Sequence, residues 1–151
     1  MYQKFHQTNR ILWAVGLIFM VIISAVVFYL DSSIYIKPSQ DQKLISDVSF
    51  IAALVITITI FIFKRSFFQP VKLVYGKDKV NIKQVLITIR RRYLIIWVLA
   101  EVILLLGFIQ YLMTVNIRQF IILGVVSLYS LTINYPQKKL AEKCEEYLTD
   151  V

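Results

Sequence analysis

The chain has 151 residues, of which 58% are hydrophobic and only 17% are charged, and its mean hydropathy is +0.69. Soluble globular domains carry about 25% charged residues, so this composition excludes an ordinary soluble domain. The net charge of +8 would suit nucleic acid, but no stacking-aromatic or groove-reading module accompanies it, and we expect no nucleic-acid partner.

Four long apolar segments follow one another along the chain, and they cover residues 11–30, 44–63, 93–113 and 118–135. As a helix that rises ~1.5 Å per residue, each can cross a hydrocarbon layer of about 30 Å, although the second and fourth are near the short limit. The runs are continuous, whereas lipid-facing barrel strands alternate with a polar lumen face. The sequence therefore predicts an all-α integral membrane protein with four transmembrane helices.

The first apolar segment also has to be compared with a signal peptide, because basic residues precede it. A 20-residue apolar run is too long for a typical signal-peptide core, and no clean small-x-small cleavage site follows Leu30. We therefore expect a retained helix. The short polar connection after it, 31–43, reads as an external loop.

The lysines and arginines predict how the helices are oriented. Two precede the first segment, nine lie in the connection 64–92, and three lie in the tail 136–151. These regions share one side of a four-span chain, and the other side carries only Lys37, Lys43 and Arg118. Because cationic residues near a span are retained in the cytoplasm, both termini and the basic loop 64–92 are expected there, with the helices in a bacterial cytoplasmic membrane.

The basic loop admits two structural interpretations. Residues 69–83 alternate around a central Gly76, which is typical of a small hairpin. We favour a helix that starts near Asn81 and runs on into the third span, because its apolar residues recur at helical spacing: Ile82, Val85, Leu86 and Ile89. Such a helix would rest its apolar stripe in the membrane interface.

The same helix would place three arginines, Arg90, Arg91 and Arg92, at the level of the lipid headgroups. The positive-inside rule already accounts for them as topology determinants, and this is the favoured interpretation. The alternative is that they bind anionic lipid, at about 1 kcal/mol for each basic residue near the surface.

Glu101 is the only ionisable residue in the interior of the four segments. A carboxylate at the bilayer centre costs roughly 2.5–3.5 kcal/mol, so it should be protonated, paired, or exposed to a wet cavity. Its own helix offers only the Trp97 indole as a donor. Candidate partners on the second and fourth helices are Thr57, Thr59, Ser127, Ser130 and Asn134. Three roles stay open: a structural polar contact, proton or cation handling, and a contact to another subunit.

Only Thr114–Arg118 separates the third apolar segment from the fourth, and Asn116 suits a turn. These two helices are therefore expected to form a tight antiparallel hairpin. The tail 136–151, which contains the single cysteine, Cys144, has the periodicity of a short amphipathic cytoplasmic helix.

Enzyme motifs are missing from the sequence. His6 is the sole histidine and precedes the first span, so an intramembrane haem site, histidine metal cluster or Ser-His-Asp triad has no histidine to use. The four glycines are widely separated and form no phosphate loop. We expect no catalysis, no metal and no cofactor.

The stretch from Arg90-Arg91-Arg92 through Ala100-Glu101 to Gly107 resembles the third span of a loose class of small four-helix bacterial inner-membrane proteins. The resemblance implies the topology and brings no activity. We expect a non-catalytic membrane protein that contacts lipids and acts as an accessory or self-associating subunit. The alternatives are a small oligomeric transporter or proton-linked channel that uses Glu101, and an anionic-lipid-binding protein.

Overall fold

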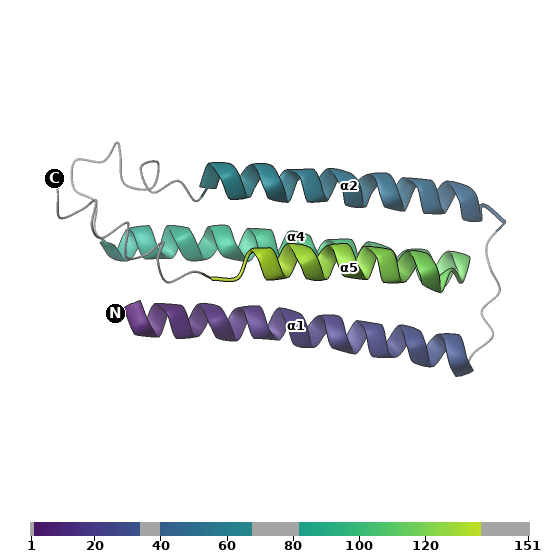
Figure 1. The fold of residues 1–151 in the computed structure, drawn as a ribbon, viewed down its shortest axis with the longest axis horizontal. Coiled ribbons are helices and arrows are strands. Elements are labelled where there is room, and N and C mark those ends of the chain that lie inside the picture. Colours follow the sequence, from purple (N-terminus) through teal and green to yellow (C-terminus); the bar gives the residue numbers. More distant parts are fainter. Residues whose placement is uncertain (1, 34–39, 68–81, 137–151) are drawn as a thin grey trace.

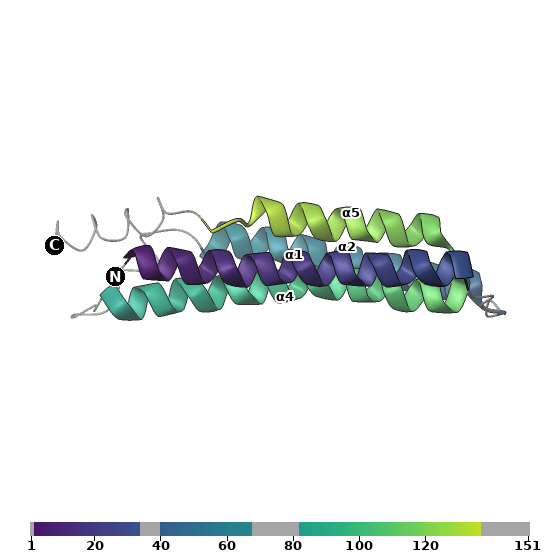
Figure 2. The same ribbon diagram turned by 90° about the horizontal axis from the view of Figure 1, so that it is seen from below.

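The computed structural model describes residues 2–33, 40–67 and 82–136. They form four helices: α1 (Tyr2–Ser33), α2 (Gln42–Phe67), α4 (Ile82–Thr114) and α5 (Ile117–Ile133). All four run along the same long axis, and each is antiparallel to the next along the chain (Figures 1 and 2). Every regular element in these ranges is a helix, which confirms the predicted all-α class.

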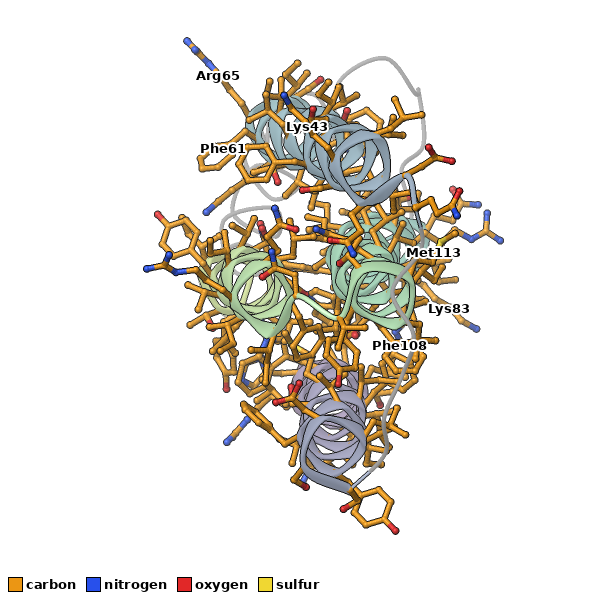
Figure 3. All side chains as sticks on the ribbon, turned by 90° about the vertical axis from the view of Figure 1, so that its right-hand side faces the viewer. Lys43, Phe61, Arg65, Lys83, Phe108 and Met113 are labelled. Atoms are coloured by element: carbon orange, nitrogen blue, oxygen red, sulfur yellow. The ribbon has the colours of Figure 1, made fainter. Side chains whose placement is uncertain are left out.

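The hairpin of α4 and α5 forms the middle of the bundle. Seen from its end, α2 and α1 lie on opposite sides of this hairpin (Figure 3). Helix α4 contacts each of the other three helices, and it carries the largest share of the buried core. The core side chains from the four helices are Met20, Val27, Ala53, Ile60, Ile96, Ala100, Ile103, Leu104, Tyr111, Phe120, Leu123 and Leu131.

Three helices contain segments long and apolar enough to cross a membrane: Phe5–Ser33, Gln42–Ser66 and Lys83–Thr114. The fourth apolar helix, Ile117–Ile133, is shorter. The outward faces of α1 and α2 expose many large apolar side chains, over an area that water would not tolerate on a soluble monomer. These features identify a membrane protein.

The turn between α4 and α5 has the tight form expected from the sequence. Val115 has a positive φ of 54°, and its N–H donates to the Tyr111 carbonyl at 2.7 Å, which ends α4. Asn116 caps α5, because its side-chain oxygen accepts the Gln119 N–H at 3.3 Å. The predicted contact between these two helices is confirmed.

The start of α4 corrects one expectation. A helix does begin at Ile82, but its apolar stripe packs against α1 and does not face outward. Val85 and Ile89 are only 2% and 1% exposed, and they belong to a cluster packed against Phe5, Leu12 and other side chains of α1. The reason is that α1 starts at Tyr2, well before its apolar segment, and therefore covers this part of α4.

Two further expectations fall on other parts of the chain. The hairpin interpretation of 69–83 lies almost entirely outside the described residues, and so does the amphipathic tail helix with Cys144.

Candidate functional site

Glu101 lies on the side of α4 that faces α1. Both of its carboxyl oxygens are buried, and neither has a hydrogen-bond partner among the residues that the structure places. A β-carbon built on Gly16 would lie 3.0 Å from Oε1 of Glu101 and 3.3 Å from Cδ1 of Leu131. The missing side chain of Gly16 therefore gives the carboxyl its space between α1 and α4.

The hydroxyl groups proposed as partners of Glu101 donate elsewhere. Ser127 of α5 donates to the carbonyl of Ala100 at 2.7 Å, one residue away from the glutamate. Thr57 and Thr59 donate to carbonyls four residues earlier in α2, at 2.7 and 2.8 Å. A hydroxyl can satisfy itself within its own helix in this way. The expected pairing with Glu101 is therefore not made by these three residues.

Asn134 and Ser130 interact with each other. The Asn134 side-chain amide donates to the Ser130 carbonyl at 2.7 Å, and the backbone carbonyl of Asn134 accepts the Trp97 indole N–H at 3.1 Å. Trp97, the one donor that the helix of Glu101 was expected to offer, is thus used at the end of α5. Both Ser130 and Asn134 are buried, but they contribute to the helix terminus and form no hydrogen bond with the carboxyl.

The carboxyl end of α5 is a polar site that the sequence analysis missed. The last four carbonyls of a helix have no partner within it. Here the Asn134 side chain donates to the Ser130 carbonyl. Trp13 of α1 donates to the Leu131 carbonyl at 3.0 Å, and Lys64 of α2 donates to the Ile133 carbonyl at 3.0 Å. The remaining one, on Thr132, accepts the N–H of Tyr135 at 3.1 Å.

The four terminal carbonyls of α5 are therefore all satisfied, and two of them accept side-chain donors from α1 and α2. Helix α4 also contributes a donor, because Trp97 bonds the next carbonyl, that of Asn134. Helix α5 has 17 residues and is about 26 Å long, which is shorter than a hydrocarbon layer of about 30 Å. Bare carbonyls at a helix end would each be expensive in lipid. The only signal in the sequence was the position of both tryptophans and one lysine near the basic ends of their spans.

The three arginines proposed as headgroup contacts are not equivalent. Arg90 donates from Nε to the Asn9 side-chain oxygen of α1 at 3.2 Å, and its guanidinium lies 5.2 Å from the centre of the Phe5 ring. Arg92 is half-buried and interacts with another group of the protein. Arg91 alone of the three is exposed. The structure therefore separates these residues, with Arg90 joining α4 to α1.

The opposite end of the bundle carries a second polar group that the sequence analysis missed. Gln110 of α4 donates to the Gln119 side chain of α5, and Gln119 donates to Ser46 of α2. Tyr111 donates to a carboxylate oxygen of Asp31 in α1 at 3.1 Å. These contacts join the four helices at the end that carries the α4–α5 turn.

The chemistry available at Glu101 is limited to holding a proton, meeting a cation or accepting a hydrogen bond. Within 2–33, 40–67 and 82–136 no group of three histidine, cysteine or acidic residues could hold a metal ion. In the comparisons with known proteins, no family model, no curated protein and no solved structure matches this chain.

Proposed function

We propose that the chain is a four-span protein of a bacterial cytoplasmic membrane, with both termini in the cytoplasm, and that it acts as a non-catalytic accessory or self-associating subunit. The ends of the helices support the proposed topology. Arg10, Lys64 and Arg92 lie at one end of the bundle, whereas Asp31 and Asp47 lie at the other. Arg10 and Asp31 are 21 residues apart on α1, about 31 Å along a helix, which matches the hydrocarbon thickness.

The satisfied carbonyls of α5 support a fourth crossing by this short helix. A helix end that lies inside the bilayer needs internal donors, and α5 has them from Trp13, Lys64 and Asn134. An α5 that ended in water would have no need of donors from other helices. The positive-inside rule then assigns the basic end to the cytoplasm.

The observation that carries the subunit role is the packed core. The apolar side chains named above pack between the described helices, and Tyr111, Ile103 and Leu104 are fully buried. Within the described ranges, this packing favours a role through the outer surface of the bundle over transport through its interior. A role in the membrane then depends on a surface that the chain shares with another copy or another protein.

Two measurements test this proposal. For the topology, Cys144 is labelled with a membrane-impermeant thiol reagent in intact and in opened cells, and Asp41→Cys in a Cys144→Ser background is the external control. Labelling of Cys144 only after opening, and of the Asp41→Cys variant already in intact cells, is expected. Labelling of Cys144 in intact cells would place the C-terminus outside and would overturn the proposed topology.

For the subunit role, the tagged protein is solubilised in mild detergent, and its mass and its co-purifying chains are determined. We expect more than one copy per particle, or a stoichiometric membrane partner. A single copy without a partner that carries ions or a solute when reconstituted alone would contradict this role.

Glu101 favours a second candidate, a small proton-linked transporter or channel. Its carboxyl is buried about nine residues beyond Arg92, roughly 13.5 Å along the helix, and no donor is bound to it among the described residues. Vesicle flux driven by a pH gradient is the test, with Glu101→Gln as the variant and Asp47→Asn, an exposed acid at the bundle end, as its control. Flux that is lost in the first and kept in the second supports this function, and flux unaltered in both removes it.

A further inference from the structure

A groove of about 360 Å³ opens on the surface near the basic end of the bundle, between residues 7–14 of α1 and Tyr135, which lies two residues beyond the end of α5. It exists because α5 ends at Ile133, whereas α1 continues alongside α4 towards Tyr2. The groove is lined by Gln7, Arg10, Ile11, Trp13, Ala14 and Tyr135.

The aromatic wall of the groove is held in place. The Trp13 indole N–H is fixed by its bond to the Leu131 carbonyl, and the Tyr135 ring meets the Trp13 ring edge to face at 4.9 Å. Tryptophan and tyrosine are the side chains that favour the level of the lipid headgroups. The shape of the groove is therefore set before any ligand arrives.

The mouth of the groove is cationic. Arg10 is exposed there, and its planar guanidinium can donate two parallel hydrogen bonds to a phosphate. The described acidic residues are far from it, because three aspartates lie at the opposite end of the bundle and Glu101 is buried at mid-depth. An anionic ligand would meet no repulsion from this part of the chain.

Below Arg10 the surface is an apolar track on one face of α1. Ile11, Val15, Ile18 and Ile22 follow one another at helical spacing, and they are 63%, 56%, 59% and 54% exposed. The track runs about 16 Å along the helix, from the headgroup level towards the middle of the bilayer. A ligand that fits both parts has an anionic head and a long apolar chain.

We propose that this groove binds an anionic phospholipid of the bilayer, with its phosphate at Arg10 and one acyl chain along the track from Ile11 to Ile22. This site differs from the arginine cluster at the start of α4, where Arg90 is already bonded to Asn9. The proposal rests on insertion into a membrane but not on the subunit role, so it stands or falls by its own test.

The test is lipid retention by the full-length protein in native mass spectrometry, with phosphatidylglycerol and phosphatidylcholine added in equal amounts. We expect the native protein to retain phosphatidylglycerol preferentially. Arg10→Gln should lower that preference about fivefold, which corresponds to the ~1 kcal/mol of one cation at headgroup level. Arg65→Gln is the matched control, because Arg65 projects away from the bundle on α2 (Figure 3).

A second variant, Ala14→Trp, fills the groove without changing its charge. It should lower retention of both lipids while the unfolding midpoint stays close to that of the native protein. Equal losses in the Arg10 and Arg65 variants would mean diffuse charge attraction and would overturn the proposal. So would unchanged retention in Ala14→Trp, the absence of any preference in the native protein, or displacement of the lipid by millimolar inorganic phosphate.

Discussion

Glu101 of α4 lies against Gly16 of α1, so closely that a β-carbon on the glycine would come within 3.0 Å of the carboxyl oxygen Oε1. Neither residue has a polar partner at this contact, because both carboxyl oxygens lack a hydrogen bond among the described residues. The pair therefore interacts through shape alone, with the glycine leaving the space that the glutamate occupies. Substitutions at the two positions should therefore have non-additive effects on the free energy of unfolding.

Gly16→Ala should destabilise the bundle by about 1 kcal/mol net, because the added methyl group overpacks the contact by more than alanine gains over glycine within a helix. In a Glu101→Ala background this loss should shrink, giving a coupling energy of at least about 0.5 kcal/mol. The free energy of unfolding by SDS titration in mixed micelles measures all four proteins of the cycle. The same cycle with Gly124→Ala is the control, since its nearest neighbour is Leu104 at 3.8 Å. Strict additivity at Gly16 would contradict the contact.

Gly107 controls how closely α4 and α5 approach. A β-carbon there would lie 3.1 Å from Cβ of Leu123, an atom that cannot rotate away. Overpacking at Gly107→Ala should lower the free energy of unfolding by about 1–3 kcal/mol. Alanine is more favourable than glycine within a helix by up to ~1 kcal/mol, and this gain offsets part of the loss. Gly124→Ala meets only an ordinary contact and should be neutral or stabilising. Equal effects of the two substitutions would contradict the close approach at Gly107.

The helices and the central hairpin could be predicted from the sequence, because continuous apolar runs and a five-residue connection leave few alternatives. The start of α4 near Asn81 was predicted as well, but the start of α1 at Tyr2 was not. Both α1 and α4 begin in polar sequence, and their first turns are stabilised by contacts between the two helices. Val85 and Ile89 of α4 are covered by Phe5 and Leu12 of α1. The periodic stripe was visible, but the sequence does not say whether a stripe meets lipid or protein.

The candidate site was predictable in part for a similar reason. A lone carboxyl within an apolar run identifies Glu101 without any structure. Its neighbours depend on which donors are already used, and Ser127 and Thr57 satisfy backbone carbonyls instead. The role of Trp13 and Lys64 was out of reach, because it depends on the depth at which α5 ends relative to three other helices.

Tyr111 is fully buried, and its hydroxyl donates a hydrogen bond of 3.1 Å to the exposed Asp31. Tyr111→Phe keeps the ring packing and removes this bond, so it should lower the free energy of unfolding by about 0.5–1.5 kcal/mol. Tyr129→Phe changes the same chemical group on an exposed side chain and should have no measurable effect. Asp31→Ala should remove the cost of Tyr111→Phe. A full cost of Tyr111→Phe in that background would exclude this bond as its cause.

Two carbonyls at the end of α5 depend on donors from other helices. Lys64→Met and Trp13→Phe each leave one carbonyl at the terminus of α5 without its donor, on Ile133 and Leu131 respectively. An unsatisfied buried acceptor costs about 1–3 kcal/mol, so each variant should lower the free energy of unfolding by that amount. Arg65→Met removes an exposed cation next to Lys64 and should cost less than about 0.5 kcal/mol.

The same variants separate two explanations of why Lys64 matters. If it acts as a hydrogen-bond donor at depth, Lys64→Met destabilises the protein equally at low and high salt, because a buried contact is poorly screened. If it acts only as a positive charge near the basic surface, its effect fades at high salt and matches that of Arg65→Met. The bond of 3.0 Å to the Ile133 carbonyl favours the first outcome, and that outcome would support the proposed fourth crossing by α5.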